Sequence, residues 1–393
     1  MGTMKPVIAP QSKARVAVVG AGVFGAWTAE YLRRAGHQVT LLDASGPAHP
    51  KASSGGESRM TRAAYGKDAI YSRMARDSLA EWKSLGERLS LTIFQPLGVL
   101  FFTTTPDDFF AQSLSASRDL GLPIVEMDPK QLQARFPMID FRGVELGLYE
   151  PHFGALMARR AVQALVAEFV AQGGEYQQLE VRVPSSQGAL ASIRLSDGSQ
   201  LEADAFVIAA GPWLGKMFPE LLGGRIVPTR QEIFYFAPPA GETCFASPHL
   251  PGWAEFSDGD FHYGFPALEN GGVKFAHHCD GAIVDPDTQR REHTKAALDE
   301  IIAYRDRRFP LLRDAPLIAA EVCQYENSSN GDFLIDFHPN MPNVLIVGGG
   351  SGHGFKHGPE VGRYAAELLS GQAQVEPRFS LASKSAAQHR EVH

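Results

Sequence analysis

The first residues with a recognisable chemical task are three glycines near the start of the chain, Gly20, Gly22 and Gly25. In this spacing the first glycine permits a tight turn, the second lets the backbone approach a pyrophosphate, and the third lets a helix pack closely on a strand. Asp43 follows at a distance where its carboxylate can accept hydrogen bonds from a ribose 2′-hydroxyl. Because an acid at this position disfavours a 2′-phosphate, the motif predicts NAD or FAD and argues against NADP.

Two basic residues, Arg59 and Arg62, stand three apart in the polar, glycine-containing stretch that follows this motif. If the stretch is helical, the two guanidinium groups share one face. Arginines in this place could bind phosphates, a flavin or an anionic substrate, and they could equally be solvated.

A run of metal-ligand residue types, His277, His278, Cys279 and Asp280, suggests a metal site at first sight. Adjacent residues of a strand point to opposite faces, however, so these four cannot converge on one ion. The chain has only 3 cysteines, which are too few and too scattered for a disulfide framework or a zinc site. We therefore expect no metal and a reducing, cytoplasmic location.

The elements that must position these residues are the strands and helices of a nucleotide-binding fold. Residues 16–19 form an apolar run that leads directly into the glycines, as a strand buried on both faces of a parallel sheet does. A helical pattern joins this run to a second strand at 39–42. Comparable apolar runs recur at 205–210 and at 344–347, the latter before a glycine-rich turn at 348–354. Features of one nucleotide domain thus occur at the start, middle and end of the chain.

Different material separates these features. Short strand-like runs within residues 226–275 alternate with turns, which favours an antiparallel sheet. We also expect one strand at 94–104, a loop at 121–129 and a helix at 155–172. The sequence predicts a mixed α/β (α+β) class, with a Rossmann-like domain interleaved with a mainly antiparallel-sheet substrate domain. The expected bounds are 1–90, 151–225 and 322–393 for the nucleotide domain, and 91–150 and 226–321 for the substrate domain.

Composition excludes several partners. The 393 residues carry a formal charge of −7, which gives no electrostatic reason to expect nucleic acid or an anionic membrane. No stretch reaches the roughly 18 consecutive apolar residues of a membrane-spanning helix. At 44% hydrophobic and 21% charged residues, the chain has the composition of a globular enzyme with a large core.

Three stretches together resemble a known family. They are the motif at Gly20–Gly25, VIAAGPW at residues 207–213, and CQY…DFLIDFHP…GGGSGHGFK at residues 323–356. From about residue 15 to 369 the chain resembles the flavin amine oxidases typified by monomeric sarcosine oxidase and N-methyltryptophan oxidase, and SGHGFK is the most specific piece. The resemblance implies FAD rather than NAD, a monomer, and oxidation by O2 of a secondary amine on an N-methyl or cyclic amino acid, with release of hydrogen peroxide.

The resemblance also implies roles for single residues. Cys323 occupies the place of a cysteine that forms a thioether to the flavin, and Lys274 that of a lysine that assists oxygen activation. His278 matches an active-site histidine. Among the remaining matches, Arg62 and Lys356 correspond to cations that bind the substrate carboxylate, Arg59 to an arginine near the flavin ring, and Tyr325 and Tyr263 to walls of the pocket. The expected cofactor-binding set is Gly20, Gly22, Val23, Phe24, Gly25, Asp43, Ala210, Gly211, Trp213, Cys323, Gly350, Gly352, Gly354 and Lys356.

Departures from the family leave the substrate open. Ser54-Gly55 stand where sarcosine oxidases usually carry paired histidines, residues 326–330 lack the family's usual proline-acid pattern, and His357 replaces an apolar residue. Sarcosine, N-methyltryptophan, pipecolate, proline-like acids and glycated amino acids all stay possible. Trp253, Phe234 and Phe236 are candidates for the pocket wall, subject to strand register.

Two other functions stay open alongside the oxidase. One is a dehydrogenase of the same fold that passes electrons to an acceptor other than oxygen. The presence of Lys274 argues against it, because the matching lysine assists oxygen activation. The other is a non-catalytic flavin-binding protein, which would need neither Arg62 nor Lys356.

Overall fold

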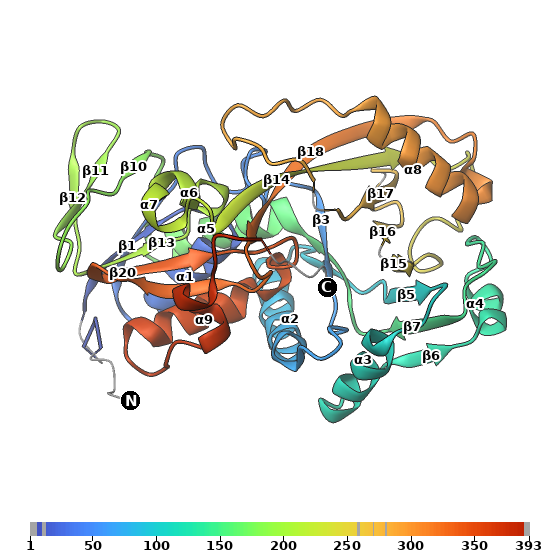
Figure 1. The fold of residues 1–393 in the computed structure, drawn as a ribbon, viewed down its shortest axis with the longest axis horizontal. Coiled ribbons are helices and arrows are strands. Elements are labelled where there is room, and N and C mark those ends of the chain that lie inside the picture. The colour runs from blue at the N-terminus through green and yellow to red at the C-terminus, as the bar shows by residue number, and fades with distance from the viewer. Residues whose placement is uncertain (1–5, 10–12, 258–259, 270, 280, 389–393) are drawn as a thin grey trace.

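The computed structural model describes residues 6–9, 13–257, 260–269, 271–279 and 281–388. The chain forms two lobes that lie side by side, one built on a largely parallel sheet and the other on a larger, mostly antiparallel sheet (Figure 1). The structural class predicted from the sequence is therefore confirmed, including the return of the chain to the first lobe after each excursion.

The first lobe contains a six-stranded sheet in the order β19-β20-β13-β1-β2-β9. The five strands from β20 to β9 run parallel to their neighbours, and β19 runs antiparallel to β20. Apolar side chains of β1, β13 and β20 are buried, as their continuous apolar runs predicted. The strands are β1 (Arg15–Val19), β2 (Gln38–Leu42), β9 (Glu175–Gln177), β13 (Ala205–Ile208), β19 (Leu334–His338) and β20 (Met341–Gly348).

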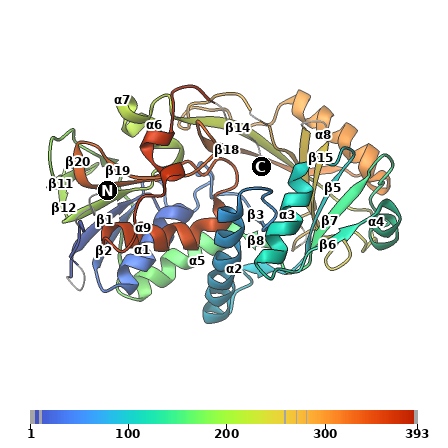
Figure 2. The same cartoon turned by 60° about the horizontal axis from the view of Figure 1, so that its bottom comes forward.

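Three helices, α1 (Val23–Arg34), α5 (Ala158–Ala171) and α9 (Gly358–Leu369), lie side by side under this sheet (Figure 2). Two glycines of α9, Gly358 and Gly362, let it approach α1 closely. A Cβ at Gly362 would lie 2.5 Å from the backbone carbon of Trp27, and a Cβ at Gly358 would lie 2.5 Å from Val23 Cγ2. No helix in the part of the chain that the structure describes is long and apolar enough to cross a membrane.

The second lobe contains an eight-stranded sheet in the order β18-β14-β17-β16-β15-β5-β7-β6. Helix α8 (Lys295–Arg308) packs on it, and its Ile301 and Tyr304 share a core with Phe234, Phe236 and Trp253. The candidate pocket aromatics therefore face α8. The strands are β5 (Val99–Thr103), β6 (Val125–Met127), β7 (Leu146–Glu150), β14 (Ile226–Phe236), β15 (Gly252–Ser257), β16 (Asp260–Phe265), β17 (Val273–His277) and β18 (Leu317–Ser328).

Between the lobes, a small sheet in the order β3-β8-β4 joins β3 (Ser58–Thr61), β8 (Gly154–Met157) and β4 (Phe94–Gln95). The remaining helices are α2 (Ala69–Leu89), α3 (Asp108–Asp119), α4 (Pro129–Arg135), α6 (Leu214–Met217) and α7 (Pro219–Leu222). One face of α2 is apolar and packs inward, with Met74, Leu79, Trp82 and Leu85 buried.

Several local expectations were wrong. The run at 94–104 forms two strands, because Pro96 has no N–H to donate and Gly98 turns the chain with a φ of +73°. The expected helix at 155–172 begins as β8, which pairs with β3 and β4 before α5 starts at Ala158. The expected loop at 121–129 contains β6.

Two features of the large sheet were also not foreseen. β15 runs parallel to β5, so the sheet is mixed rather than wholly antiparallel. The expected domain boundary at residue 322 lies inside β18, which pairs with β14 along its length. The domain bounds therefore stay a prediction.

Candidate active site

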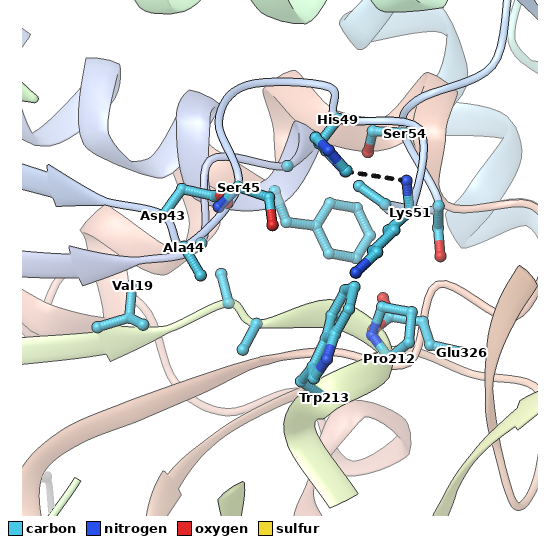
Figure 3. Close-up of a pocket in the computed structure, with 18 of the residues that line it drawn as sticks. Val19, Asp43, Ala44, Ser45, His49, Lys51, Ser54, Pro212, Trp213 and Glu326 are labelled. Atoms are coloured by element: carbon cyan, nitrogen blue, oxygen red, sulfur yellow. Dashed lines mark hydrogen bonds between the residues drawn. The ribbon is translucent and has the colours of Figure 1, made fainter. Parts of the chain in front are cut away.

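A cavity of about 950 Å³ runs from the carboxyl ends of β1 and β2 toward the second lobe (Figure 3). Most of the expected cofactor residues line it, and so do Arg59 and Tyr325. Gly25, Cys323 and Lys356 do not. The expected residues in the wall are Gly20, Gly22, Val23, Phe24, Asp43, Ala210, Gly211, Trp213, Gly350, Gly352 and Gly354.

The glycines at one end of the cavity have the geometry that phosphate binding requires. Gly20 has a φ of +105°, and a Cβ there would lie 2.2 Å from the Ala209 carbonyl oxygen. A Cβ at Gly25 would lie 1.9 Å from the Gly20 carbonyl oxygen, so this glycine serves helix packing. Gly22 faces open space, apart from Ser54 Oγ at 3.5 Å from a built Cβ. Backbone can therefore approach a diphosphate at the N-terminus of α1, where the helix dipole favours negative charge.

Two polar side chains hold this end in place. Val23 N donates to Ser54 Oγ at 3.1 Å, so the serine that departs from the family pattern fixes the start of α1. Asp43 accepts from Ala21 N, Ser45 N and Gly46 N, each at 2.8 Å. A carboxylate offers about four acceptor positions, so Asp43 keeps capacity for a ribose hydroxyl. The residues present therefore fit a dinucleotide cofactor with a free ribose.

At the other end, Arg59, Lys274 and Cys323 come together around β3. Lys274 is 2% exposed, and its Nζ donates to Ser58 O at 3.0 Å. Arg59 donates to the same carbonyl at 2.8 Å, and its Nη2 lies 3.7 Å from Cys323 Sγ. Burial and the charge of Arg59 lower the pKa of Lys274 to about 8, although Glu57 and Glu321 act in the opposite direction. Three residues from distant parts of the chain thus meet, and of the three Arg59 lines the cavity while Lys274 and Cys323 lie behind it.

His278, Tyr325 and Tyr263 form a neighbouring group. His278 Nδ1 and the Tyr325 hydroxyl are 3.0 Å apart. A Cβ at Gly352 would lie 2.8 Å from both rings, so this position in the glycine-rich turn has no room for a side chain. Tyr263 interacts with Tyr325 and Arg59, and burial raises the pKa of its hydroxyl.

A second group of cations gathers on Tyr65. Lys356 is 4% exposed, and its Nζ donates to the Tyr65 hydroxyl at 2.7 Å and to His353 O at 2.8 Å. The Arg62 guanidinium lies 4.0 Å above the centre of the Tyr65 ring. Burial and the charge of Arg62 lower the pKa of Lys356 well below its ordinary value, and Glu150 opposes this shift. Two expected carboxylate-binding cations therefore share one aromatic support.

The stretch around Arg59 and Arg62 is not helical, so the shared helical face considered from the sequence is wrong. Arg59 lies in β3, which pairs with β8, and Arg62 follows directly after the last residue of that strand, so the two side chains do not share a helical face. Arg59 lies with Lys274 and Cys323, and Arg62 lies with Lys356 on Tyr65. One short segment therefore contributes a cation to each of the two groups.

Three contributors were not foreseen from the sequence. Tyr65 supports both cations, and its hydroxyl also lies 2.8 Å from Nε2 of the buried His357. Phe355 lines the cavity with Arg59 6.0 Å from its ring. Glu326 is a buried acid in the cavity wall. The sequence contained two signals for these residues. Tyr65 is an aromatic residue three positions after Arg62, and positions 326 and 357 depart from the family pattern.

The histidine run is divided, because His278 belongs to this site and His277 does not. His278 faces Tyr325, whereas His277 Nε2 lies 2.9 Å from Asp260 and its Nδ1 2.9 Å from Glu300. A carboxylate thus faces each ring nitrogen of His277, and the hydrogen bond with Glu300 raises the pKa of this imidazole. The His262 and His277 rings stack within 7° at 4.5 Å, so no ion can lie in both ring planes. Asp280 lies outside the described residues.

Comparisons with known proteins agree with this geometry. The family model described as FAD dependent oxidoreductase matches residues 15–368. Monomeric sarcosine oxidase of Bacillus sp. (strain B-0618) is 29% identical over 366 residues, covering 91% of this chain and 93% of that protein. N-methyl-L-tryptophan oxidase of Citrobacter koseri is 29% identical over 368 residues, covering 93% and 96%.

Solved structures share the fold. A modified fructosyl peptide oxidase from Aspergillus nidulans superposes with a TM-score of 0.84 at 20% identity, covering 98% of this chain and 97% of that one. L-proline dehydrogenase from P. horikoshii gives a TM-score of 0.79 at 18% identity, covering 94% and 97%. At these identities the likeness concerns the fold alone.

Proposed function

Because the chain belongs to the FAD-dependent oxidoreductase family, we propose that it oxidises the carbon–nitrogen bond of a secondary amine on an N-methyl or cyclic amino acid. O2 takes the electrons, and the products are an imine, which hydrolyses to an aldehyde or keto acid, and hydrogen peroxide. The relatives named as sarcosine and N-methyl-L-tryptophan oxidases support the amine class.

The observation that carries the proposal is the pair of cations on Tyr65. Arg62 and Lys356 are both buried, and Lys356 has no carboxylate within ion-pair distance among the described residues. A substrate carboxylate would form charge-assisted hydrogen bonds with them. The same positive charges would lower the pKa of the substrate ammonium, so the amine would be neutral for oxidation.

FAD, when bound, accepts the hydride equivalent from the carbon beside the amine nitrogen. The residues that would hold it are Gly20, Gly22 and Asp43 at one end of the cavity, and Gly350 and the Arg59 wall at the other. Lys274 would supply a buried positive charge where negative charge develops as O2 is reduced. His278, Tyr325 and Tyr263 would close the substrate space beside this wall.

We further infer that Cys323 carries the flavin through a thioether. Support comes from its free thiol beside Arg59 at the cavity end and from its match to the family motif. Acid precipitation tests the bond directly: the yellow colour should stay in the protein pellet and should move to the supernatant in Cys323→Ala. Colour in the supernatant from the unaltered protein would overturn the thioether alone.

Anaerobic mixing tests the oxidase itself. The yellow protein should bleach with N-methyl or cyclic amino acids and recolour in air with release of one peroxide per substrate. Bleaching followed by slow recolouring in air, but rapid recolouring with a dye, would identify a dehydrogenase instead. No bleaching with any amine would leave a flavin-binding protein without catalysis. The cytoplasmic location and the monomeric state remain predictions, and gel filtration tests the second.

A further inference from the structure

Glu326 is a buried acid that the proposed reaction does not use. It lies on β18, is 7% exposed, and its carboxyl group borders the cavity beside Gly211 and Gly350. Gly350 N donates to its Oε1 at 3.1 Å. Its Oε2 is buried and has no hydrogen-bond partner in the described part of the chain. A buried polar atom without a partner is costly, so its retention beside a cavity points to a ligand.

In the part of the chain that the structure describes, no cationic side chain lies within ion-pair distance of this carboxyl. Burial raises the pKa of Glu326 to about 7, and the Gly350 N–H opposes the rise. Its cross-strand neighbour on β14 is Pro228, and the turn Gly211–Trp213 brings no charge to it. Among the described residues, Glu326 Oε2 has no hydrogen-bond partner, and the other titratable side chains in the cavity wall are Asp43, His49, Lys51, Arg59, Glu180, Arg182, Lys216, Asp287 and Tyr325.

We propose that Glu326 is a further ligand of the FAD and binds it as a neutral acid. The carboxyl group donates one hydrogen bond to the cofactor while it keeps the bond from Gly350 N. Figure 3 shows Glu326 across the cavity from Asp43, next to Pro212, so it faces the flavin half of the cofactor rather than the ribose beside Asp43. A neutral acid suits this place, because an ionised one would share a low-dielectric cavity with the diphosphate charge.

The inference about Glu326 rests on the proposed function, because that function supplies the FAD. The test must therefore distinguish a failure of the inference from a failure of the proposed function. The Cys323→Ala variant serves as the parent, because FAD can be removed from it and added back whether or not a thioether forms. Glu326→Gln keeps a neutral donor and an acceptor, whereas Glu326→Leu keeps bulk without either. The measurement is the FAD dissociation constant from flavin fluorescence between pH 6 and 9, with far-UV circular dichroism as the check on folding.

In the parent, FAD should bind more weakly as the pH rises through about 7, by up to about tenfold per pH unit, because the neutral acid is lost. Glu326→Gln should keep the affinity of pH 6 across the whole range, and Glu326→Leu should bind at least about tenfold more weakly at pH 6. A pH dependence that persists unchanged in Glu326→Gln would overturn the inference even if Glu326→Leu fails to fold. A parent that binds no FAD at any pH would overturn the proposed function instead.

Discussion

Two buried lysines, Lys274 and Lys356, have almost the same exposure but differ in the balance of the charges around them. Lys274 donates to the backbone and hydroxyl of Ser58, and two carboxylates, Glu57 and Glu321, raise its pKa against the effect of burial. Lys356 donates to a phenol and a backbone carbonyl, and the nearest charge with a large effect is the guanidinium of Arg62. A guanidinium lowers the pKa of each lysine, Arg59 for Lys274 and Arg62 for Lys356. Two acids oppose this effect at Lys274, and one, Glu150, opposes it at Lys356.

This difference separates two tasks. With a pKa of about 8, Lys274 is mostly charged at neutral pH without any ligand, as a group that stabilises negative charge on O2 must be. Burial and the Arg62 charge hold the pKa of Lys356 well below its ordinary value, and a bound carboxylate would raise it. We infer that the first site is positive at neutral pH without a ligand, and that a substrate carboxylate favours the charged form of the second.

The largest expected effect follows from removing the charge of Lys274. Lys274→Met should lower kcat/KM for O2 by about 10²–10³-fold, the usual loss when one preorganised electrostatic contact is removed. Oxygen-electrode kinetics at saturating amino acid measure it. A dye used as electron acceptor should restore turnover, and a loss with the dye as large as that with O2 would contradict the assignment.

A smaller loss is expected at the anion site. Lys356→Met should lower kcat/KM for the amino acid about 10–100-fold, since a hydrogen bond to a charged group contributes about 1.5–3 kcal/mol. The matched control is a secondary amine without a carboxylate, measured on both proteins, for which the variant should lose less than about threefold. Equal losses of kcat/KM on both substrates would mean that Lys356 does not bind the substrate carboxylate.

The two lysines should also differ in pH dependence. Reoxidation by O2 should slow as the pH rises through about 8, because Lys274 is charged below its pKa and neutral above it. The decline should reach at most about tenfold per pH unit. Lys274→Arg, which stays protonated, should flatten the profile measured by rapid mixing of reduced enzyme with O2. A decline that survives in this variant belongs to another group.

Tyr65→Phe should give the smallest effect. It removes the hydroxyl that Lys356 and His357 share but keeps the ring beneath Arg62. A neutral hydrogen bond contributes about 1 kcal/mol, so KM for the amino acid should rise about fivefold with kcat little changed. Substrate saturation curves measure both constants. An unchanged KM would show that the hydroxyl does not position Lys356.

The sequence predicted best what depends on spacing along the chain. Gly20, Gly22 and Gly25, and the turn that contains Gly350 and Gly352, carry their geometry in short segments. The resemblance supplied Lys274, Cys323 and Lys356 as site residues, and the structure places each of them near the cavity end or on Tyr65.

Predictions that depend on pairing between distant segments were less successful. Arg59 lies on a strand, and Arg62 directly after it, because β3 pairs with β8, which begins about a hundred residues later. Strand register likewise turned Trp253 toward Tyr304 of α8, where their rings stack at 5.6 Å. Tyr65 and Glu326 could not be recognised, because their importance comes from partners that only the fold brings near them.

The most direct test of the two-lysine account measures both half-reactions in both variants by rapid mixing. Flavin reduction by the amino acid is followed without oxygen, and reoxidation of the reduced protein is followed with O2. The account predicts that Lys356→Met slows only reduction and that Lys274→Met slows only reoxidation. Slowing of the same half-reaction by both variants would contradict it.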